Sequence, residues 1–152
     1  MPQLSLHSPI GDLTISEEDG AIIALDWGWG RDQNETVLLL QARDQLDAYF
    51  DGDLEDFDLP LNAVGTPHQQ KVYDAMSAIP YGETLTYGEI AKNIGSVARA
   101  VGGACGSNPI PVIIPCHRVL AGNSMGGYSG DGGLETKTAL LRLEGALPQT
   151  LF

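Results

Sequence analysis

The chain has few cysteines, few basic residues and no long apolar run, and each of these shortages narrows its possible functions. Its 152 residues include two cysteines, Cys105 and Cys116, which are too few for a disulfide framework. No apolar run approaches the roughly 18 residues that a membrane-spanning helix needs. The start of the chain, residues 1–5, has neither a basic leader nor an apolar core. We therefore expect a cytoplasmic protein without a membrane partner, in which both cysteines are free thiols.

Basic side chains are scarce as well, since 8 Lys and Arg stand against 20 Asp and Glu and give a formal net charge of -12. Such a charge opposes DNA binding, because phosphate contacts use Lys and Arg. The acidity is confined, however, to the first part of the chain. Residues 1–64 contain 14 acidic and 2 basic side chains, whereas residues 65–152 contain 6 of each. Any contact with nucleic acid is therefore expected after residue 65, and should be weakly electrostatic.

The first part of the chain has the pattern of a small sheet followed by one helix. Short apolar or alternating segments at residues 4–6, 12–16 and 21–27 are separated by turn residues, which favours an antiparallel sheet. From about Gln33 apolar residues recur at helical spacing, with Gly52 as the stop. The pattern predicts a folded acidic cap without catalytic residues.

The second part has the signals of a mostly helical domain. A capping box at residues 66–69 starts a helix that runs to about residue 79. The same pattern at residues 86–89 starts a helix to about residue 94, and a tight turn then leads into a helix over residues 97–105. Two short helices around a tight turn are typical of a helix-turn-helix. A last helix is expected over residues 134–144.

Together these patterns predict an α/β (α+β) protein in two domains. Residues 1–62 form the small mixed sheet-plus-helix cap. Residues 63–152 form a mostly helical domain with a winged-helix-like helix-turn-helix.

One cysteine stands beside basic groups at the end of the apolar run 110–114. Cys116 is followed directly by His117 and Arg118. Nearby positive charge or a neighbouring base lowers the pKa of a thiol and so makes the nucleophilic thiolate available. The signal is weak alone, because many cysteines are simply small buried apolar residues. The residues around Cys116 make it stronger.

These surroundings resemble the O6-alkylguanine-DNA alkyltransferase family, whose members move an alkyl group from guanine O6 to a cysteine. The resemblance covers about residues 4–145. It rests on Arg99-Ala-Val-Gly-Gly, Asn108-Pro-Ile-Pro, Pro115-Cys-His-Arg, Gly126-Gly-Tyr-Ser-Gly, Lys137 and the segment 140–145. It implies direct reversal of O6-alkylguanine, and of O4-alkylthymine, in double-stranded DNA by a monomer that is consumed in the reaction. No organic cofactor or metal is implied; the zinc-ligand set near the start of some relatives is missing, since no cysteine precedes Cys105.

The resemblance implies four catalytic residues. Cys116 is the nucleophile, and His117 takes its proton through a water. Glu144 orients the imidazole, and Asn108 hydrogen-bonds the backbone around the cysteine. Independently of the resemblance, an acid at a helix C-terminus opposes the helix dipole, so Glu144 is expected to have a buried partner.

The resemblance also implies residues that flip the damaged nucleotide out of the duplex, because a stacked base cannot present its O6 alkyl carbon to sulfur. Arg99, at the start of the second helix of the pair, would fill the vacated stack. Tyr87 would help to rotate the nucleotide and donate a hydrogen bond to guanine N3.

The remaining implied residues line the base pocket or support it. Tyr128 and Ser129 correspond to the pocket wall and the donor to O6, and the backbone carbonyls of Cys116 and Val119 would accept from the exocyclic amine. Lys137 would fix the active-site loop, and it is counted with the DNA-contact and base-binding residues. For Arg118 two roles are open, a structural ion pair and a contact with the DNA backbone.

Two other functions stay open at this stage. The chain could be a non-catalytic alkyltransferase-like protein that flags lesions, although such relatives replace the cysteine. It could also be a cysteine hydrolase with Cys116 and His117 as a dyad, although adjacent residues rarely converge and no oxyanion motif is visible. The chain also departs from the usual pattern: it is about two residues shorter between Tyr87 and Arg99, and Cys105 stands where relatives often carry a larger apolar residue.

Overall fold

The computed structural model describes residues 1–122, 125–128, 130 and 132–147. Its internal contacts divide the chain into two compact units, Met1–Val64 and Gly65–Phe152. Within the described residues, no helix combines the length and the apolar composition that crossing a bilayer requires.

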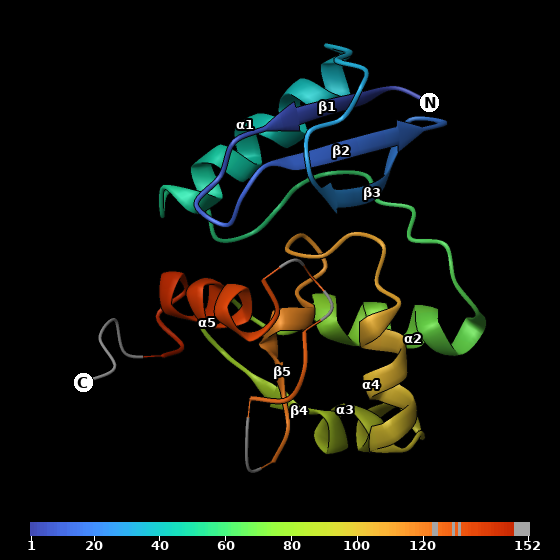
Figure 1. Ribbon diagram of the computed structural model, residues 1–152. Coiled ribbons are helices and arrows are strands. Elements are labelled where there is room, and N and C mark those ends of the chain that lie inside the picture. Colours follow the sequence, from blue (N-terminus) through green and yellow to red (C-terminus); the bar gives the residue numbers. More distant parts are fainter. Residues whose placement is uncertain (123–124, 129, 131, 148–152) are drawn as a thin grey trace. The chain divides into compact units, whose positions relative to one another are not determined.

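The first unit is a three-stranded antiparallel sheet with one helix on it (Figure 1). Its elements are β1 (Gln3–Leu6), β2 (Leu13–Glu18), β3 (Ala21–Trp27) and α1 (Val37–Phe50). The strands follow the order β1-β2-β3, with a register shift between Ser16 and Glu17. The core lies between sheet and helix and contains Leu13, Ile15, Ile22, Leu39, Leu46 and Tyr49, none of them exposed.

The helix of this unit starts later than the expected Gln33. The side chain of Thr36 accepts a hydrogen bond from the backbone N–H of Leu39, which makes Thr36 the N-cap and Val37 the first helical residue. A cap of this kind sets the boundary more sharply than apolar spacing, because residues before it keep an extended backbone.

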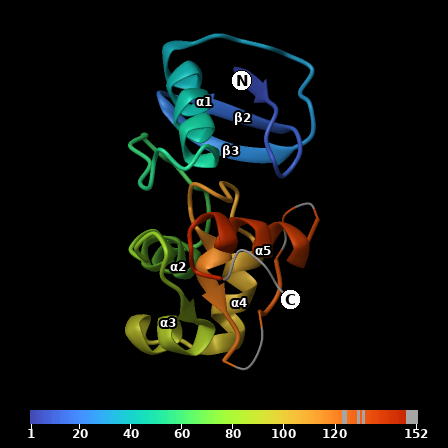
Figure 2. The ribbon, with the colours of Figure 1, turned by 90° about the vertical axis from the view of Figure 1, so that its left-hand side faces the viewer.

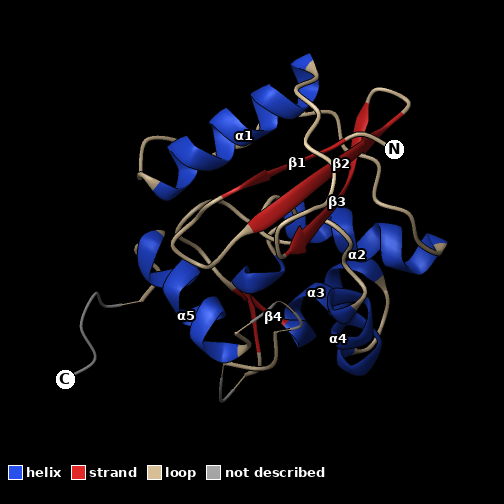
Figure 3. Cartoon of the chain, turned by 45° about the horizontal axis from the view of Figure 1, so that its top comes forward, coloured by secondary structure: helices blue, strands red, loops and turns tan. Residues whose placement is uncertain are grey.

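The second unit is mostly helical (Figures 2 and 3). Its elements are α2 (Pro67–Ser77), β4 (Leu85–Thr86), α3 (Tyr87–Ile94), α4 (Ala98–Gly106), the short 3₁₀ helix η1 (Cys116–Arg118), β5 (Val119–Leu120) and α5 (Leu134–Leu143). Both expected capping boxes are present, at Thr66 with Gln69 and at Thr86 with Glu89. The fold class expected from the sequence is confirmed.

The helix pair α3 and α4 meets at a left-handed glycine. Gly95 ends α3 with φ 71°, a conformation that glycine adopts without the steric cost that a Cβ would bring. Val97 then has an extended backbone and starts α4 without a side-chain cap. The two helices pack on each other, and both pack on α2, so the expected helix-turn-helix is present.

The sequence did not indicate the parallel pairing of β4 with β5, in which Leu85 lies opposite Val119 and Thr86 opposite Leu120. Two-residue strands carry too little alternation to be recognised. The pairing ties the N-cap of α3 to the residues directly after η1. It thereby holds Tyr87 near the turn that carries Cys116.

Candidate active site

Two tight turns bring Cys116 to its position. In the first, the N–H of Ile113 donates to the carbonyl of Pro111 at 2.9 Å around Val112, whose φ is 71°. In the second, the N–H of Cys116 donates to the carbonyl of Ile114 at 2.8 Å around Pro115, with φ -81° and ψ 67°. These are γ-turns, and the positive φ of the first is costly for a β-branched residue. Burial of the whole segment 110–119 holds this strained path in place.

Asn108 fastens both turns through its side-chain amide. Its Oδ1 accepts from the N–H of Ile110 at 3.0 Å, and its Nδ2 donates to the carbonyl of Ile114 at 2.9 Å. Ile114 O is also the acceptor of the turn at Cys116, so one amide supports the backbone on both sides of the strained residue. The sequence-based expectation that Asn108 bonds this backbone agrees with these contacts.

A buried chain of three side chains runs from His117 through Glu144 to Arg118. His117 Nε2 lies 2.7 Å from Glu144 Oε2, and neither side chain is exposed. Arg118 donates from Nε to Oε1 at 2.8 Å and from Nη2 to Oε2 at 2.9 Å. Glu144 directly follows α5. The buried partner expected for this acid is present, and two side chains, His117 and Arg118, contact its carboxylate.

Burial also sets the protonation of the site at rest. It raises the pKa of the Cys116 thiol, although a hydrogen bond from Asn108 and the charge of Lys137 oppose the shift. Burial lowers the pKa of His117, while the hydrogen bond and charge of Glu144 oppose this and Arg118 and Lys137 add to it. The resting pair is therefore a neutral thiol beside a neutral imidazole. His117 Nδ1 is buried and has no hydrogen-bond partner among the described residues.

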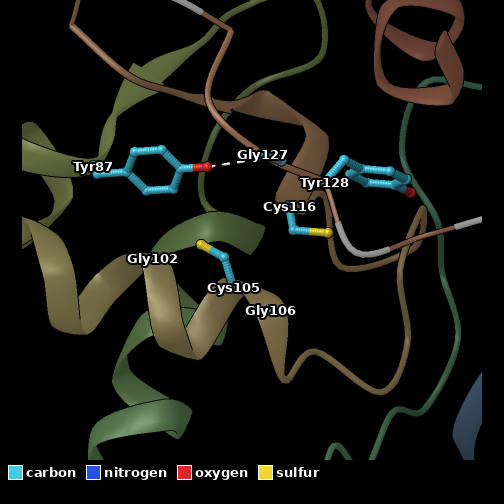
Figure 4. Close-up of a pocket in the computed structure, with 7 residues that line it drawn as sticks. All are labelled: Tyr87, Gly102, Cys105, Gly106, Cys116, Gly127 and Tyr128. Carbon is cyan, nitrogen blue, oxygen red and sulfur yellow. Dashed lines mark hydrogen bonds between the residues drawn. The ribbon is translucent and has the colours of Figure 1, made fainter. Parts of the chain in front are cut away.

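Cys116 opens onto a pocket of about 410 Å³, a size within the range of small-molecule sites. Figure 4 shows the two sulfurs of Cys105 and Cys116 between the rings of Tyr87 and Tyr128. The lining consists of two aromatic rings, two thiols and three glycines: Tyr87, Tyr128, Cys105, Cys116, Gly102, Gly106 and Gly127. The pocket thus offers flat aromatic walls and two thiols.

The second thiol in the pocket differs from the first. Cys105 Sγ lies 3.5 Å from Met76 Sδ, and burial followed by the neighbouring Cys116 raises the pKa of Cys105 to about 12. Both thiols are therefore neutral at rest. Cys116 differs from Cys105 in the hydrogen bond from Asn108, which lowers its pKa, and in having His117 as the next residue.

Lys137 ties down the loop that carries Tyr128. Its ammonium is fully buried in α5 and donates to the carbonyls of Val119 at 2.7 Å, of Gly127 at 3.0 Å and of Met125. Burial lowers the pKa of Lys137. The loop-fixing role expected for this lysine agrees with these bonds. Its place in the DNA-contact set does not, because a fully buried ammonium cannot reach a phosphate.

Arg118 requires the same correction. Of its two open roles the structure shows the ion pair, and the guanidinium is buried against Glu144 with Nη1 donating to the carbonyl of Ile79 at 2.7 Å. It is therefore not available for phosphate contacts. Arg99, by contrast, lies exposed in the first turn of α4 and has no ion pair within the described part of the chain. Ser129 lies outside the described residues.

Sequence reasoning missed two groups of site residues. Gly102 and Gly106 line the pocket, and their spacing of four residues with Cys105 beside them was the available signal, because residues four apart share a helix face. Tyr81 was also missed. Its ring lies 5.7 Å from Arg118 Cζ and its hydroxyl donates to the carbonyl of Leu143 at 3.2 Å; no local pattern marks it.

The described residues contain no group of three or more His, Cys, Asp and Glu side chains placed to hold a metal ion.

Comparison with known proteins gives two family matches along the chain. Residues 4–63 match the family model "6-O-methylguanine DNA methyltransferase, ribonuclease-like domain", and residues 67–146 match "6-O-methylguanine DNA methyltransferase, DNA binding domain". The chain belongs to the 6-O-methylguanine DNA methyltransferase family. The family expected from the sequence is thereby confirmed, and with it the reaction class, transfer of an alkyl group from methylated DNA to a protein cysteine.

Relatives within this methyltransferase family match nearly the full chain. It is 42% identical to the constitutive methylated-DNA–protein-cysteine methyltransferase of Bacillus subtilis, over 91% of this chain and 92% of the relative. It is equally 42% identical to the corresponding protein of Methanosarcina acetivorans, over 92% and 96%. The crystal structure of Mycobacterium tuberculosis OGT in complex with DNA superposes with a TM-score of 0.86 at 42% identity, over 96% of this chain and 94% of that one.

We predict that Asn108→Ala destabilises the second unit, because it leaves the N–H of Ile110 and one bond of Ile114 O without their partner. Each buried polar group left unsatisfied costs about 1–3 kcal/mol, so a loss of roughly 2–4 kcal/mol in the free energy of unfolding is expected. Urea denaturation measures it. Asn108→Ser is the control, since its hydroxyl can accept from the N–H two residues on without adding a buried charge, and it should be less destabilising; equal losses in both variants would contradict the importance of the bond to Ile110.

Proposed function

We propose that this protein repairs O6-alkylguanine in double-stranded DNA by moving the alkyl group to Cys116 in one irreversible turnover. One observation carries the assignment of the nucleophile: the thiol of Cys116 lines the pocket, and the imidazole of the next residue pairs with a buried carboxylate. O4-alkylthymine also carries its alkyl group on a ring oxygen, and we include it as a second substrate.

In the proposed reaction a proton leaves the thiol of Cys116 and passes through a water to His117 Nδ1. The thiolate attacks the alkyl carbon in line, the new C–S bond forms as the C–O6 bond breaks, and the electron pair of the broken bond stays on the guanine. Tyr87 hydrogen-bonds guanine N3, and the base leaves neutral after taking up one proton. The thiol thus loses the proton that the guanine gains, and the thioether has no hydrolytic exit.

The raised pKa of Cys116 is consistent with this order of events. A buried neutral thiol is a poor nucleophile, so a base must act while the substrate is bound. The orienter of that base is Glu144, which accepts from Nε2–H in the manner of the acid in hydrolytic triads. Asn108 favours the thiolate once it forms, because its hydrogen bond lowers the pKa of the thiol.

The flipped base would lie between the aromatic walls. Tyr128 would form one face of the site, and Ser129 is assigned as the donor to O6 on the resemblance alone. The carbonyls of Cys116 and Val119 already accept from the N–H of Val119 and from Lys137 Nζ. Each oxygen has a second lone pair, which could accept from the exocyclic amine of guanine.

The two compact units support a proposal of two domains, an acidic cap at residues 1–62 and an alkyltransferase domain at residues 63–152. The first holds the excess negative charge, so we assign DNA contact to the second. Cys105 and Cys116 are both free and buried, and a thiol nucleophile is preserved in a reducing compartment. We therefore place the protein in the cytoplasm and propose that it acts as a monomer.

Replacing Cys116 by Ser should abolish transfer from an O6-methylguanine duplex while leaving binding of that duplex intact. An alcohol close to its free pKa is a poor nucleophile even beside a histidine. Cys105→Ser is the matched control in the same pocket and should keep transfer. Gel-shift binding together with loss of the methylated base measures both properties. Transfer that survives in Cys116→Ser and disappears in Cys105→Ser would show that Cys105, and not Cys116, accepts the alkyl group.

Arg99→Ala should slow repair of duplex DNA on the order of tenfold or more, because flipping leaves stacking worth a few kcal/mol to be replaced. Reaction with free O6-benzylguanine should hardly change, since no base has to be flipped. Lys92→Ala, also an exposed basic residue, controls for the loss of one charge. Equal slowing of Arg99→Ala on both substrates would show that Arg99 supports the fold and does not act in flipping.

With Arg118 and Lys137 buried, few basic groups of the second unit remain for phosphates, chiefly Lys71, Lys92 and Arg99. Each neutralised phosphate contributes a slope of about -0.9 in log K against log salt concentration. A duplex titration over a salt series should therefore give a shallow slope, on the order of -2 to -3. A slope near -8 would reveal a basic surface that these residues do not supply.

A further inference from the structure

We propose that Arg118 is a positioning residue for the reaction. By keeping Glu144 ionised, it fixes His117 in the form whose Nδ1 carries no proton and can accept the proton of Cys116. This inference rests on the proposed function and adds to it a residue that sequence reasoning placed in an ion pair or on DNA.

The carboxylate of Glu144 is bound on both of its oxygens. Oε1 accepts from Arg118 Nε, whereas Oε2 accepts from Arg118 Nη2 and faces His117 Nε2. Side-chain exposure is 0% for His117 and Glu144 and 7% for Arg118. A charge taken out of water to this degree needs a partner of opposite sign. Arg118 is the cation that directly contacts Glu144 among the described ion pairs.

The pair with Arg118 decides which ring nitrogen of His117 carries the proton. An ionised carboxylate can only accept hydrogen bonds, so Nε2 facing it must be the N–H. A neutral imidazole has one N–H, and Nδ1 is therefore bare. Bare Nδ1 is the atom that the proposed mechanism requires as the proton acceptor, and it is the buried ring nitrogen without a partner in the described structure.

Removing the guanidinium would take away the positive charge that contacts both oxygens of Glu144, and the Glu144–His117 pair would then bind an extra proton at neutral pH. If the imidazole takes that proton, both ring nitrogens carry one. If the carboxyl takes it and donates to Nε2, the neutral ring must carry its proton on Nδ1. In both arrangements Nδ1 is occupied and His117 cannot act as the base.

Arg118 is itself fixed by contacts with residues outside the segment 108–119 that carries Cys116. Nη1 donates to the carbonyl of Ile79, the residue after the C-cap of α2, and Cζ lies over the ring of Tyr81. The hydroxyl of Tyr81 donates in turn to the carbonyl of Leu143, next to Glu144. Besides Glu144 and Arg118, the charged group that acts on His117 is Lys137 of α5, which also lowers its pKa but bonds only to backbone carbonyls in the described contacts. The titratable thiol of Cys116 precedes His117 directly in η1.

The first test is the pH dependence of alkyl transfer from free O6-benzylguanine, which requires no DNA. In Arg118→Gln the acid limb of the rate should move to higher pH by about 1–3 units, because losing a charge at this range shifts the pKa of its neighbours by that much. Arg118→Lys restores the charge and should give a clearly smaller shift. Val72→Ala, a buried change in α2, controls for a loosened fold and should leave the limb in place.

Rates that fall by one factor at every pH would show a purely structural role and overturn the inference. Equal shifts in Arg118→Gln and Arg118→Lys, or a shift as large in Val72→Ala, would do the same.

The second test uses the wild-type protein and depends neither on a variant that folds nor on activity. Nitrogen-15 NMR of the His117 ring at neutral pH should report a protonated Nε2 and a bare Nδ1. A ring protonated on Nδ1, or on both nitrogens, would overturn the inference even if alkyl transfer occurs. Conversely, absence of transfer in a protein with the expected ring protonation would overturn the proposed function and leave only the effect of Arg118 on the protonation of His117.

Discussion

The rest of the active site depends on one buried interaction, the carboxylate of Glu144 held between Arg118 and His117. A carboxylate without exposure is tolerated only with full hydrogen bonding and an opposite charge. Here those partners come from η1, while Ile79 and Tyr81 hold the guanidinium from the other side. The end of α5, the active-site turn and the segment after α2 are thereby joined at one point. A change in any of these three segments would therefore alter the hydrogen bonding of the His117 imidazole.

The turn that carries Cys116 is costly to form, and its cost explains the residues around it. Val112 adopts a positive φ that a β-branched side chain disfavours, and Pro115 fixes the inverse γ-turn that follows. Asn108 bonds the backbone on both sides, and apolar burial from Ile110 to Ile114 holds the rest. The strained backbone at Val112 and the hydrogen bonds of Asn108 together place the thiol of Cys116 at the pocket. The other thiol, Cys105, lines the same space from a relaxed helix.

Much of this arrangement could be predicted from the sequence, because local signals determine it. Both capping boxes, the glycine between α3 and α4 and an acid at the end of α5 follow rules that a single segment obeys. The contacts that were missed join distant segments: β4 with β5, and Tyr81 with Arg118. Arg118 was placed only as one of two options, since a guanidinium beside a cysteine fits an ion pair and a phosphate equally well. Only packing distinguishes the two.

The most direct test of the central claim is peptide mass analysis after the protein meets an excess of O6-methylguanine duplex. The two pocket thiols, Cys105 and Cys116, make the result decisive, because they line one cavity and differ in their neighbours. We predict one methyl group per protein, on the peptide containing Cys116, with no further loss of methylated base once the protein is used up. Methyl on Cys105, or removal of more than one methyl per protein, would contradict transfer to a thiol activated through His117 and Glu144.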